Sequence, residues 1–182
     1  MLVGAGVMFT GIIEAVGEIV ACEPRSGDLR LRVKTFGLDL AGISLGDSIA
    51  TNGVCLTVIE LPGDGYVADV SSETLANTTI GDWQAGTPVN LERALTPSSR
   101  LGGHLVSGHI DARSERFRLR APDSLAKYIA HKGSITVDGT SLTVNRVEGA
   151  EFELNIVPHT LEHTVMGTYV PGSRVNLEVD LV

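Results

Sequence analysis

The chain has 182 residues, of which 43% are hydrophobic and 4% aromatic, and it carries a formal net charge of −8 with a pI near 5.0. This length fits one ordinary domain or two small ones, with a core built from aliphatic side chains. Because phosphate binding needs a basic patch, the acidic balance disfavours nucleic acid as a partner.

Targeting and membrane signals are not found in the sequence. The apolar start MLVGAGVMFTG has no basic region, so it is not a signal peptide, and no apolar run approaches the ~20 residues of a membrane span. Cys22 and Cys55 are too few for a disulfide framework or a structural zinc site. We therefore expect a reducing, cytoplasmic compartment.

The segments predicted to be strands are short and separated by glycine-containing turns. In LRLRVK (29–34), alternation turns Leu29, Leu31 and Val33 toward a core and the basic residues toward water. Further strands are expected at 54–60, 66–70, 87–93, 114–120, 141–147, 152–157 and 174–181. Short strands at regular spacing predict small antiparallel barrels, an all-β fold.

One short helix is predicted at 122–133. Asp123 or Ser124 would cap its first turn, and Gly133 would end it.

The chain contains an internal repeat. LGDSIATNGVCLTV (45–58) aligns with HKGSITVDGTSLTV (131–144) at an offset of 86, and the alignment continues without a gap to the end of the chain. Of 51 aligned pairs 17 are identical, where chance gives about three or four, which indicates duplication. We expect two similar domains, 8–95 and 104–182, joined by a linker at 96–103 rich in Pro, Ser and Gly.

Upstream of this alignment the offset changes. FTGIIE (9–14) matches VSGHID (106–111) at an offset of 97, so the second copy lacks 11 residues, the counterpart of AVGEIVACEPR. Either the second half has a deletion, or a loop is missing from the chain as given. We favour the missing loop.

Several motifs together resemble the riboflavin synthase family. They are MFTGIIE, NGVCLTV, SSETL, GGHLVSGHID, KGSITVDGTSLTV and PHTL, and the resemblance runs from Met8 to the end of the chain. The chain departs from the family pattern in two places. Ala112 directly follows GHID, where the family has a segment like GVGEI, and the chain stops at Val182, where the family continues into a trimer helix.

The resemblance implies a fold and a reaction. The fold is two tandem six-stranded antiparallel Greek-key barrels with short helices, assembled as a homotrimer, with an association with lumazine synthase as a further expectation. The enzyme would transfer a four-carbon unit between two molecules of 6,7-dimethyl-8-ribityllumazine, giving riboflavin and 5-amino-6-ribitylamino-pyrimidinedione. It uses no metal and no redox cofactor. The site lies between the first barrel of one subunit and the second barrel of a neighbour.

Three pairs of equivalent segments are expected to line the two substrate pockets, with Lys132 holding a carbonyl or ribityl oxygen. Their hydroxyl, amide and carboxylate groups suit the ribityl chain. The segments are Gly11, Ile12 and Ile13 with Gly108, His109 and Ile110; Cys55, Leu56 and Thr57 with Ser141, Leu142 and Thr143; and Asp69, Val70, Ser71, Ser72, Glu73 and Thr74 with Asn155, Ile156, Val157, Pro158, His159 and Thr160.

The reaction needs a base for one lumazine and a nucleophile or activated water for the other. We expect His109 to transfer the proton, because histidine titrates near working pH, with His104 second. The candidates for the remaining steps are Cys55, Ser48, Asp138 and Asp180. The sequence does not assign donor and acceptor barrels.

Each candidate also has an ordinary structural interpretation. A metal site at His104 and His109 is disfavoured, because their spacing of five fits no helical pair and no acidic or Cys cluster completes a ligand set. Cys55 could be a small core residue, and Asp138 before Gly139 is typical of a tight turn. The remaining candidates with such an alternative are Lys132 and Asp180 as surface charges and Thr74 and Thr160 as caps.

Two rival functions remain at this point. A non-catalytic lumazine- or flavin-binding protein would share the duplicated barrels and use one pocket. An oligonucleotide-binding barrel would use the arginine-bearing strand faces, but the net charge and the scattered aromatic residues argue against it.

Overall fold

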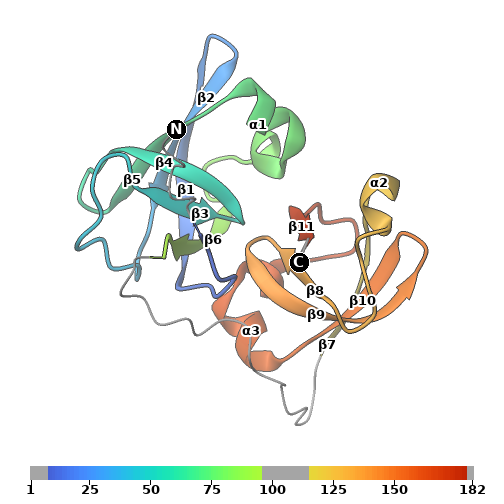
Figure 1. Ribbon diagram of the computed structural model, residues 1–182. Helices are drawn as coiled ribbons and strands as arrows, with labels where there is room; N and C mark the ends of the chain where they lie inside the picture. Colours follow the sequence, from blue (N-terminus) through green and yellow to red (C-terminus); the bar gives the residue numbers. More distant parts are fainter. Residues whose placement is uncertain (1–7, 96–114, 180–182) are drawn as a thin grey trace, which may run out of the picture.

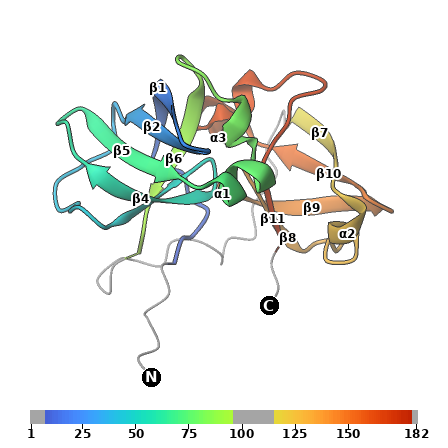
Figure 2. The same ribbon diagram turned by 90° about the horizontal axis from the view of Figure 1, so that it is seen from above.

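The computed structural model describes residues 8–95 and 115–179 as two mainly β halves that lie side by side, the first in blue to green and the second in yellow to red (Figure 1). The view from above shows the same arrangement (Figure 2). Each half has its own cluster of buried apolar side chains. No helix in the described part of the chain is long and apolar enough to cross a bilayer.

The first half is a closed barrel, with strand order β1-β2-β5-β4-β3-β6. Its elements are β1 (Ala15–Arg25), β2 (Asp28–Lys34), β3 (Ser48–Thr51), β4 (Val54–Glu60), β5 (Gly65–Val70), α1 (Ser72–Asn77), the 3₁₀ helix η1 (Thr79–Asp82) and β6 (Pro88–Arg93). The expected alternation in β2 is confirmed, because Leu31 and Val33 are fully buried while Arg30 and Arg32 point outward to acidic partners.

The second half forms a five-stranded sheet over the described residues, in the order β11-β8-β9-β10-β7. Its elements are β7 (Glu115–Arg120), α2 (Asp123–Ala126), β8 (Ser134–Val137), β9 (Thr140–Glu148), β10 (Glu151–Ile156), α3 (Pro158–His163), the 3₁₀ helix η2 (Val165–Thr168) and β11 (Leu177–Val179). The mostly β, duplicated fold expected from the sequence is confirmed.

The repeat seen in the sequence is also a repeat of structure. The bounds of β3 and β8, of β5 and β10, of α1 and α3, and of η1 and η2 each differ by the same 86 residues. The duplication therefore repeated the order and length of these secondary-structure elements along with the sequence.

The short helix expected at 122–133 is confirmed only at its start, since α2 spans Asp123–Ala126. Pro122 occupies the N-cap and makes no side-chain cap bond. Beyond α2 the chain forms single turns and leaves the helical path at Lys132, which has a φ of 67° and donates its N–H to the carbonyl of Val144. Pairing with strand β9 prevails over helix propensity there.

We favoured a missing loop for the 11 residues that the second copy lacks, and the structure describes only their counterpart in the first copy. Their counterpart AVGEIVACEPR is the whole of β1 (Ala15–Arg25), the strand that joins β2 to β6 and closes the first barrel.

Candidate functional site

The N-terminal segment of the first barrel is held against the second half. Glu92, which is 4% exposed, accepts hydrogen bonds from the backbone N–H groups of Thr10 and Gly11 at 2.5 and 3.0 Å. The carbonyl of Gly11 in turn accepts the N–H of Ser141 at 2.9 Å. The space is so tight that a Cβ on Gly11 would lie 2.6 Å from the Cβ of Ser141. The structure thus brings together two predicted segments, one from each copy, whereas Ile12 is 46% exposed.

The predicted site residues of strand β4 point alternately to solvent and to the core. Cys55 and Thr57 are exposed, while Leu56 is 3% exposed and belongs to the core. Ser48 lies opposite Thr57 in the β3–β4 pairing. The interpretation of Cys55 as a core residue is therefore wrong, and its thiol is open to solvent and solutes.

The segment from Asp69 to Thr74 forms the turn from β5 into α1. Asp69 binds Arg30 through both carboxylate oxygens, at 2.8 and 2.9 Å, and this hydrogen-bonded guanidinium holds the pKa of Asp69 below its usual value. Ser71, not Thr74, is the N-cap of α1, since its Oγ accepts the N–H of Thr74. Val70 is buried, while Ser72 and Glu73 are exposed in the first turn.

The equivalent segment of the second half begins in β10 and continues into α3. Asn155 is exposed and Ile156 is buried. Val157 is the N-cap of α3, followed by Pro158 in the first turn. The ring of His159 stacks on that of His163, with centroids 4.1 Å apart, and Thr160 is partly buried.

The remaining predicted residues of the second half lie on or beside β9. Ser141 and Leu142 are partly buried, and Thr143 and Lys132 are exposed. Gly108, Ile110, His104, His109 and Asp180 lie outside the described residues.

Asp138 is a buried carboxyl, 3% exposed, at the β8–β9 hairpin. Its Oδ2 accepts the hydroxyl of Tyr169 at 2.5 Å, and its Oδ1 accepts the N–H of Asn176 at 2.8 Å. Burial outweighs these hydrogen bonds and raises the pKa of Asp138 to about 6. Asp138 and Gly139 have φ of 43° and 81°, as in a type I′ hairpin turn. This geometry gives Asp138 a structural role in the turn.

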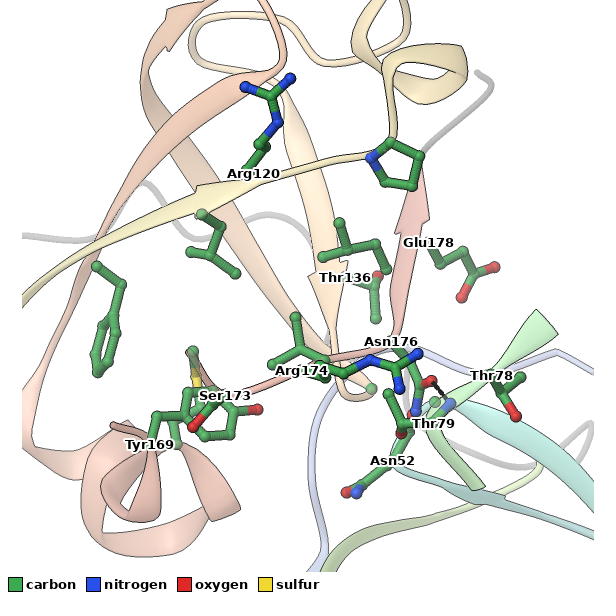
Figure 3. Close-up of a pocket in the computed structure, with 18 of the residues that line it drawn as sticks. Asn52, Thr78, Thr79, Arg120, Thr136, Tyr169, Ser173, Arg174, Asn176 and Glu178 are labelled. Atoms are coloured by element: carbon green, nitrogen blue, oxygen red, sulfur yellow. Dashed lines mark hydrogen bonds between the residues drawn. The ribbon is translucent and has the colours of Figure 1, made fainter. Parts of the chain in front are cut away.

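A large cavity opens beside the second sheet. Its volume is about 1140 Å³, and it is bounded by β7, by the segment leading into β11 and by the β3–β4 hairpin of the first barrel. Figure 3 shows Arg120 on β7 and Glu178 on β11 around this opening, with Thr136 between them. Of the predicted site residues, Cys55 lines it.

Sequence reasoning missed two kinds of residue in this cavity. The arginines of β7 and Asn176 line the cavity but were not among the predicted site residues. The identity of Asn176 with Asn90 in the repeat alignment was the signal that could have pointed to it. Within the described residues, no group of three or more His, Cys, Asp and Glu side chains could hold a metal ion.

Comparison with known proteins identifies the family. The model of the lumazine binding domain matches residues 10–94 and again 102–180. A riboflavin synthase of Photobacterium phosphoreum is 49% identical over 186 aligned positions, covering 96% of this chain and 85% of that protein. The chain belongs to the riboflavin synthase family.

Other riboflavin synthases agree with this assignment. The Brucella abortus protein is 44% identical over 95% of the chain and 93% of its own length, and the Bacillus subtilis protein is 39% identical over 96% of the chain and 86% of its own length. The 186 and 189 aligned positions exceed the 182 residues of the chain, so these synthases contain residues that this chain lacks.

Solved structures share the fold. LumP complexed with 6,7-dimethyl-8-(1'-D-ribityl) lumazine superposes with a TM-score of 0.79 at 23% identity, over 95% of this chain and 99% of that one. LumP complexed with riboflavin gives the same TM-score at 25% identity, over 95% and 100%.

Proposed function

We propose that this chain catalyses the final step of riboflavin biosynthesis, the dismutation of two 6,7-dimethyl-8-ribityllumazine molecules into riboflavin and 5-amino-6-ribitylamino-pyrimidinedione. One observation carries the proposal: both copies match the lumazine binding domain, in a chain 44–49% identical to riboflavin synthases along almost its whole length. Two molecules of one substrate call for two pockets of similar shape, and the duplicated halves, 8–95 and 104–182, supply them.

The duplication also suits the chemistry. Holding both lumazines in facing pockets turns a bimolecular encounter into a nearly unimolecular one, worth up to ~7–11 kcal/mol of the barrier. One molecule must donate and the other accept, so equivalent positions should differ in their polar groups. Cys55 and Ser141 are such a pair, as are Asn52 and Asp138.

We assign the proton transfer to His109 and the role of nucleophile or water activator to Cys55, with Ser48 and Asp180 as further candidates. The exposure of Cys55 at the large cavity supports its part in this assignment. The burial and satisfied hydrogen bonds of Asp138 favour a structural role over a catalytic one. We also propose a trimer, an association with lumazine synthase and a cytoplasmic location, on the family resemblance alone.

The direct test is to incubate the protein with the lumazine alone and to follow riboflavin by absorbance and fluorescence, with no added cofactor. Riboflavin should form in proportion to the lumazine consumed, two molecules for each product. Lumazine that binds and stays unchanged would instead identify a binding protein of the LumP kind.

The two histidines provide an internal control for the mechanism. His109→Ala should lower turnover far more than His104→Ala, because only His109 lies in the GHID segment equivalent to the start of the first barrel. Equal losses in both variants would overturn the assignment of the proton transfer to His109.

A further inference from the structure

The described part of the second half contains no counterpart of β1, the strand that closes the first barrel. In the first barrel β1 pairs with β2 on one side and with β6 on the other. The counterparts of β2 and β6 are β7 and β11. Among the described residues β7 pairs only with β10, and β11 only with β8. Within the described residues, both strands therefore have an edge with no paired strand, and we call the space between them the slot.

The open slot exposes the interior of the second sheet. Apolar positions that the first barrel buries to 1% or less are partly exposed in the second half. The equivalent pairs are Leu31 and Phe117, Val33 and Leu119, Val89 and Val175, and Leu91 and Leu177. In the first barrel Ile19 of β1, which is 0% exposed, covers this core, and no residue of the second copy aligns with it.

The large cavity occupies the slot. It is lined on one side by β7 from Arg116 to Arg120 and on the other by residues from Arg174 to Glu178. Its volume of about 1140 Å³ exceeds the ~300–1,000 Å³ of pockets for single small ligands. A segment of extended chain matches the two free edges as well as the volume, because it can pair its backbone groups.

The charges around the slot select the kind of segment. Arg116, Arg118 and Arg120 project from β7, and Glu178 is the one carboxylate among the residues that line the cavity. Arg174, on the other side, is paired with Asp82 at 2.6 Å. Arg118 already contacts Glu151 of the neighbouring strand β10 at 2.6 Å, and Arg120 contacts Asp123 at 3.3 Å and Glu151 at 3.8 Å.

The first barrel shows what fits against such an edge. Glu18 and Glu23 of β1 lie opposite Lys34 and Arg30 of β2, whose counterparts are Arg120 and Arg116. The hydrogen bond to Asp69 is the main cause that raises the pKa of Arg30, and the nearby carboxylate of Glu23 adds to it in the same direction. Opposite charges directly across a strand pair are stabilising.

We propose that the slot between β7 and β11 accepts an extended segment of a partner protein, in which apolar residues alternate with acidic ones. The segment pairs antiparallel with β7, covers Phe117 and Leu119 with its apolar side chains, and meets Arg116 and Arg120 with its carboxylates. This inference goes beyond the proposed lumazine chemistry, although Cys55 lines the same cavity.

The first experiment uses a fluorescein-labelled peptide, AVGEIVASEPR, which is β1 with its cysteine replaced by serine. Fluorescence polarisation with the full chain should show saturable binding. The charge-reversed peptide AVGKIVASKPR should bind at least tenfold more weakly. Absence of binding, or equal binding of both peptides, would overturn the proposal and leave the arginines as charges that keep an edge from pairing.

Protein variants then locate the binding. Arg116→Glu together with Arg120→Glu should weaken peptide binding at least tenfold, whereas Arg25→Glu, which changes an exposed arginine at the end of β1, should leave it unchanged.

An insertion variant tests whether the peptide occupies the place of the missing strand. Inserting AVGEIVACEPR between Asp111 and Ala112 should supply that strand, raise the melting temperature and abolish peptide binding. Unchanged peptide binding by the insertion variant would show that the peptide binds elsewhere on the chain and would contradict the proposal. A concentration-dependent dimer that the peptide cannot dissociate would assign the slot to a second copy instead.

Discussion

Asn90 and Asn176 occupy equivalent positions of the repeat, and each amide accepts a backbone hydrogen bond from the opposite half. The Oδ1 of Asn90 accepts the N–H of Val165, and the Oδ1 of Asn176 accepts the N–H of Thr79, both at 2.8 Å. Val165 and Thr79 are themselves equivalent, each the first residue of a 3₁₀ helix. Figure 3 shows Asn176 reaching toward Thr79.

The donor atoms of the same two amides repeat this exchange. The Nδ2 of Asn90 donates to the carbonyl of Asp138 at 2.8 Å, and the Nδ2 of Asn176 donates to the carbonyl of Asn52 at 3.0 Å. The two halves are therefore joined by a pseudo-symmetric pair of amides, each saturated by the other copy's backbone.

Removing one amide should weaken the whole chain. Asn90→Ala leaves the N–H of Val165 and the carbonyl of Asp138 without these partners, and Asn90 is 1% exposed. An unsatisfied buried group costs about 1–3 kcal/mol, so we expect a loss in that range or above from urea unfolding. Asn77→Ala, which removes an exposed side-chain bond to Glu73, is the control and should cost much less. Equal losses in the two variants would contradict a role for Asn90 in joining the halves.

The two hairpins that meet at this junction leave no room for a side chain. A Cβ on Gly53 would lie 2.8 Å from the backbone N of Gly139, and the same distance holds in reverse. Gly53→Ala should therefore destabilise the chain more than Gly63→Ala. Both glycines have positive φ, 77° and 99°, but Gly63 faces open space. Gly63→Ala measures the backbone strain alone, about 1–2 kcal/mol, and thermal unfolding of both variants isolates the steric part. Similar melting temperatures would show that the hairpins move apart easily.

Asp138 should make stability fall as pH rises through the mildly acidic range. Burial raises its pKa from 3.8 to about 6, so between these values the folded state holds a proton that the unfolded state has released. The protonated carboxyl adds up to about 3 kcal/mol to the free energy of unfolding. This contribution is complete below pH 4 and is lost as the pH rises through 6. Urea unfolding between pH 4 and 7 should show this slope in the wild type and not in Asp138→Asn.

Asp69 provides a control of opposite sign for this experiment. Arg30 lowers the pKa of Asp69, so its contribution is present above its unfolded pKa and fades as pH falls. Asp69→Asn should therefore leave the slope between pH 4 and 6 in place. Loss of that slope in Asp69→Asn, or its persistence in Asp138→Asn, would show that Asp138 is not its source.

Much of the fold could be predicted because local patterns and the duplication agree. The alternation in β2 and β7 and the constant offset of 86 are properties of neighbouring residues. The short helix expected at 122–133 extends only over Asp123–Ala126, and Lys132 instead bonds to Val144 of β9, a contact that is not visible locally.

The site was harder to predict for the same reason. The bonds of Asn90 and Asn176 cross between halves, with partners 48 to 124 residues away along the chain. That the counterpart of the missing residues is a barrel-closing strand became clear only from the pairing of β1 with both β2 and β6.

Cys55 is the described residue through which the catalytic assignment can be tested most directly. Its thiol is exposed at the cavity, and its place in the repeat is taken by Ser141. If the thiol takes part in the reaction, Cys55→Ser should lower kcat by about a hundredfold, a typical single-group contribution, while lumazine affinity changes little.

The second cysteine is the matched control. Cys22 is partly buried and donates to the carbonyl of Trp83 at 3.5 Å, and burial raises the pKa of its thiol. Cys22→Ser should therefore leave kcat unchanged. Steady-state turnover and fluorescence titration with lumazine separate the two effects, and an unchanged kcat in Cys55→Ser would leave this thiol with no part in the chemistry.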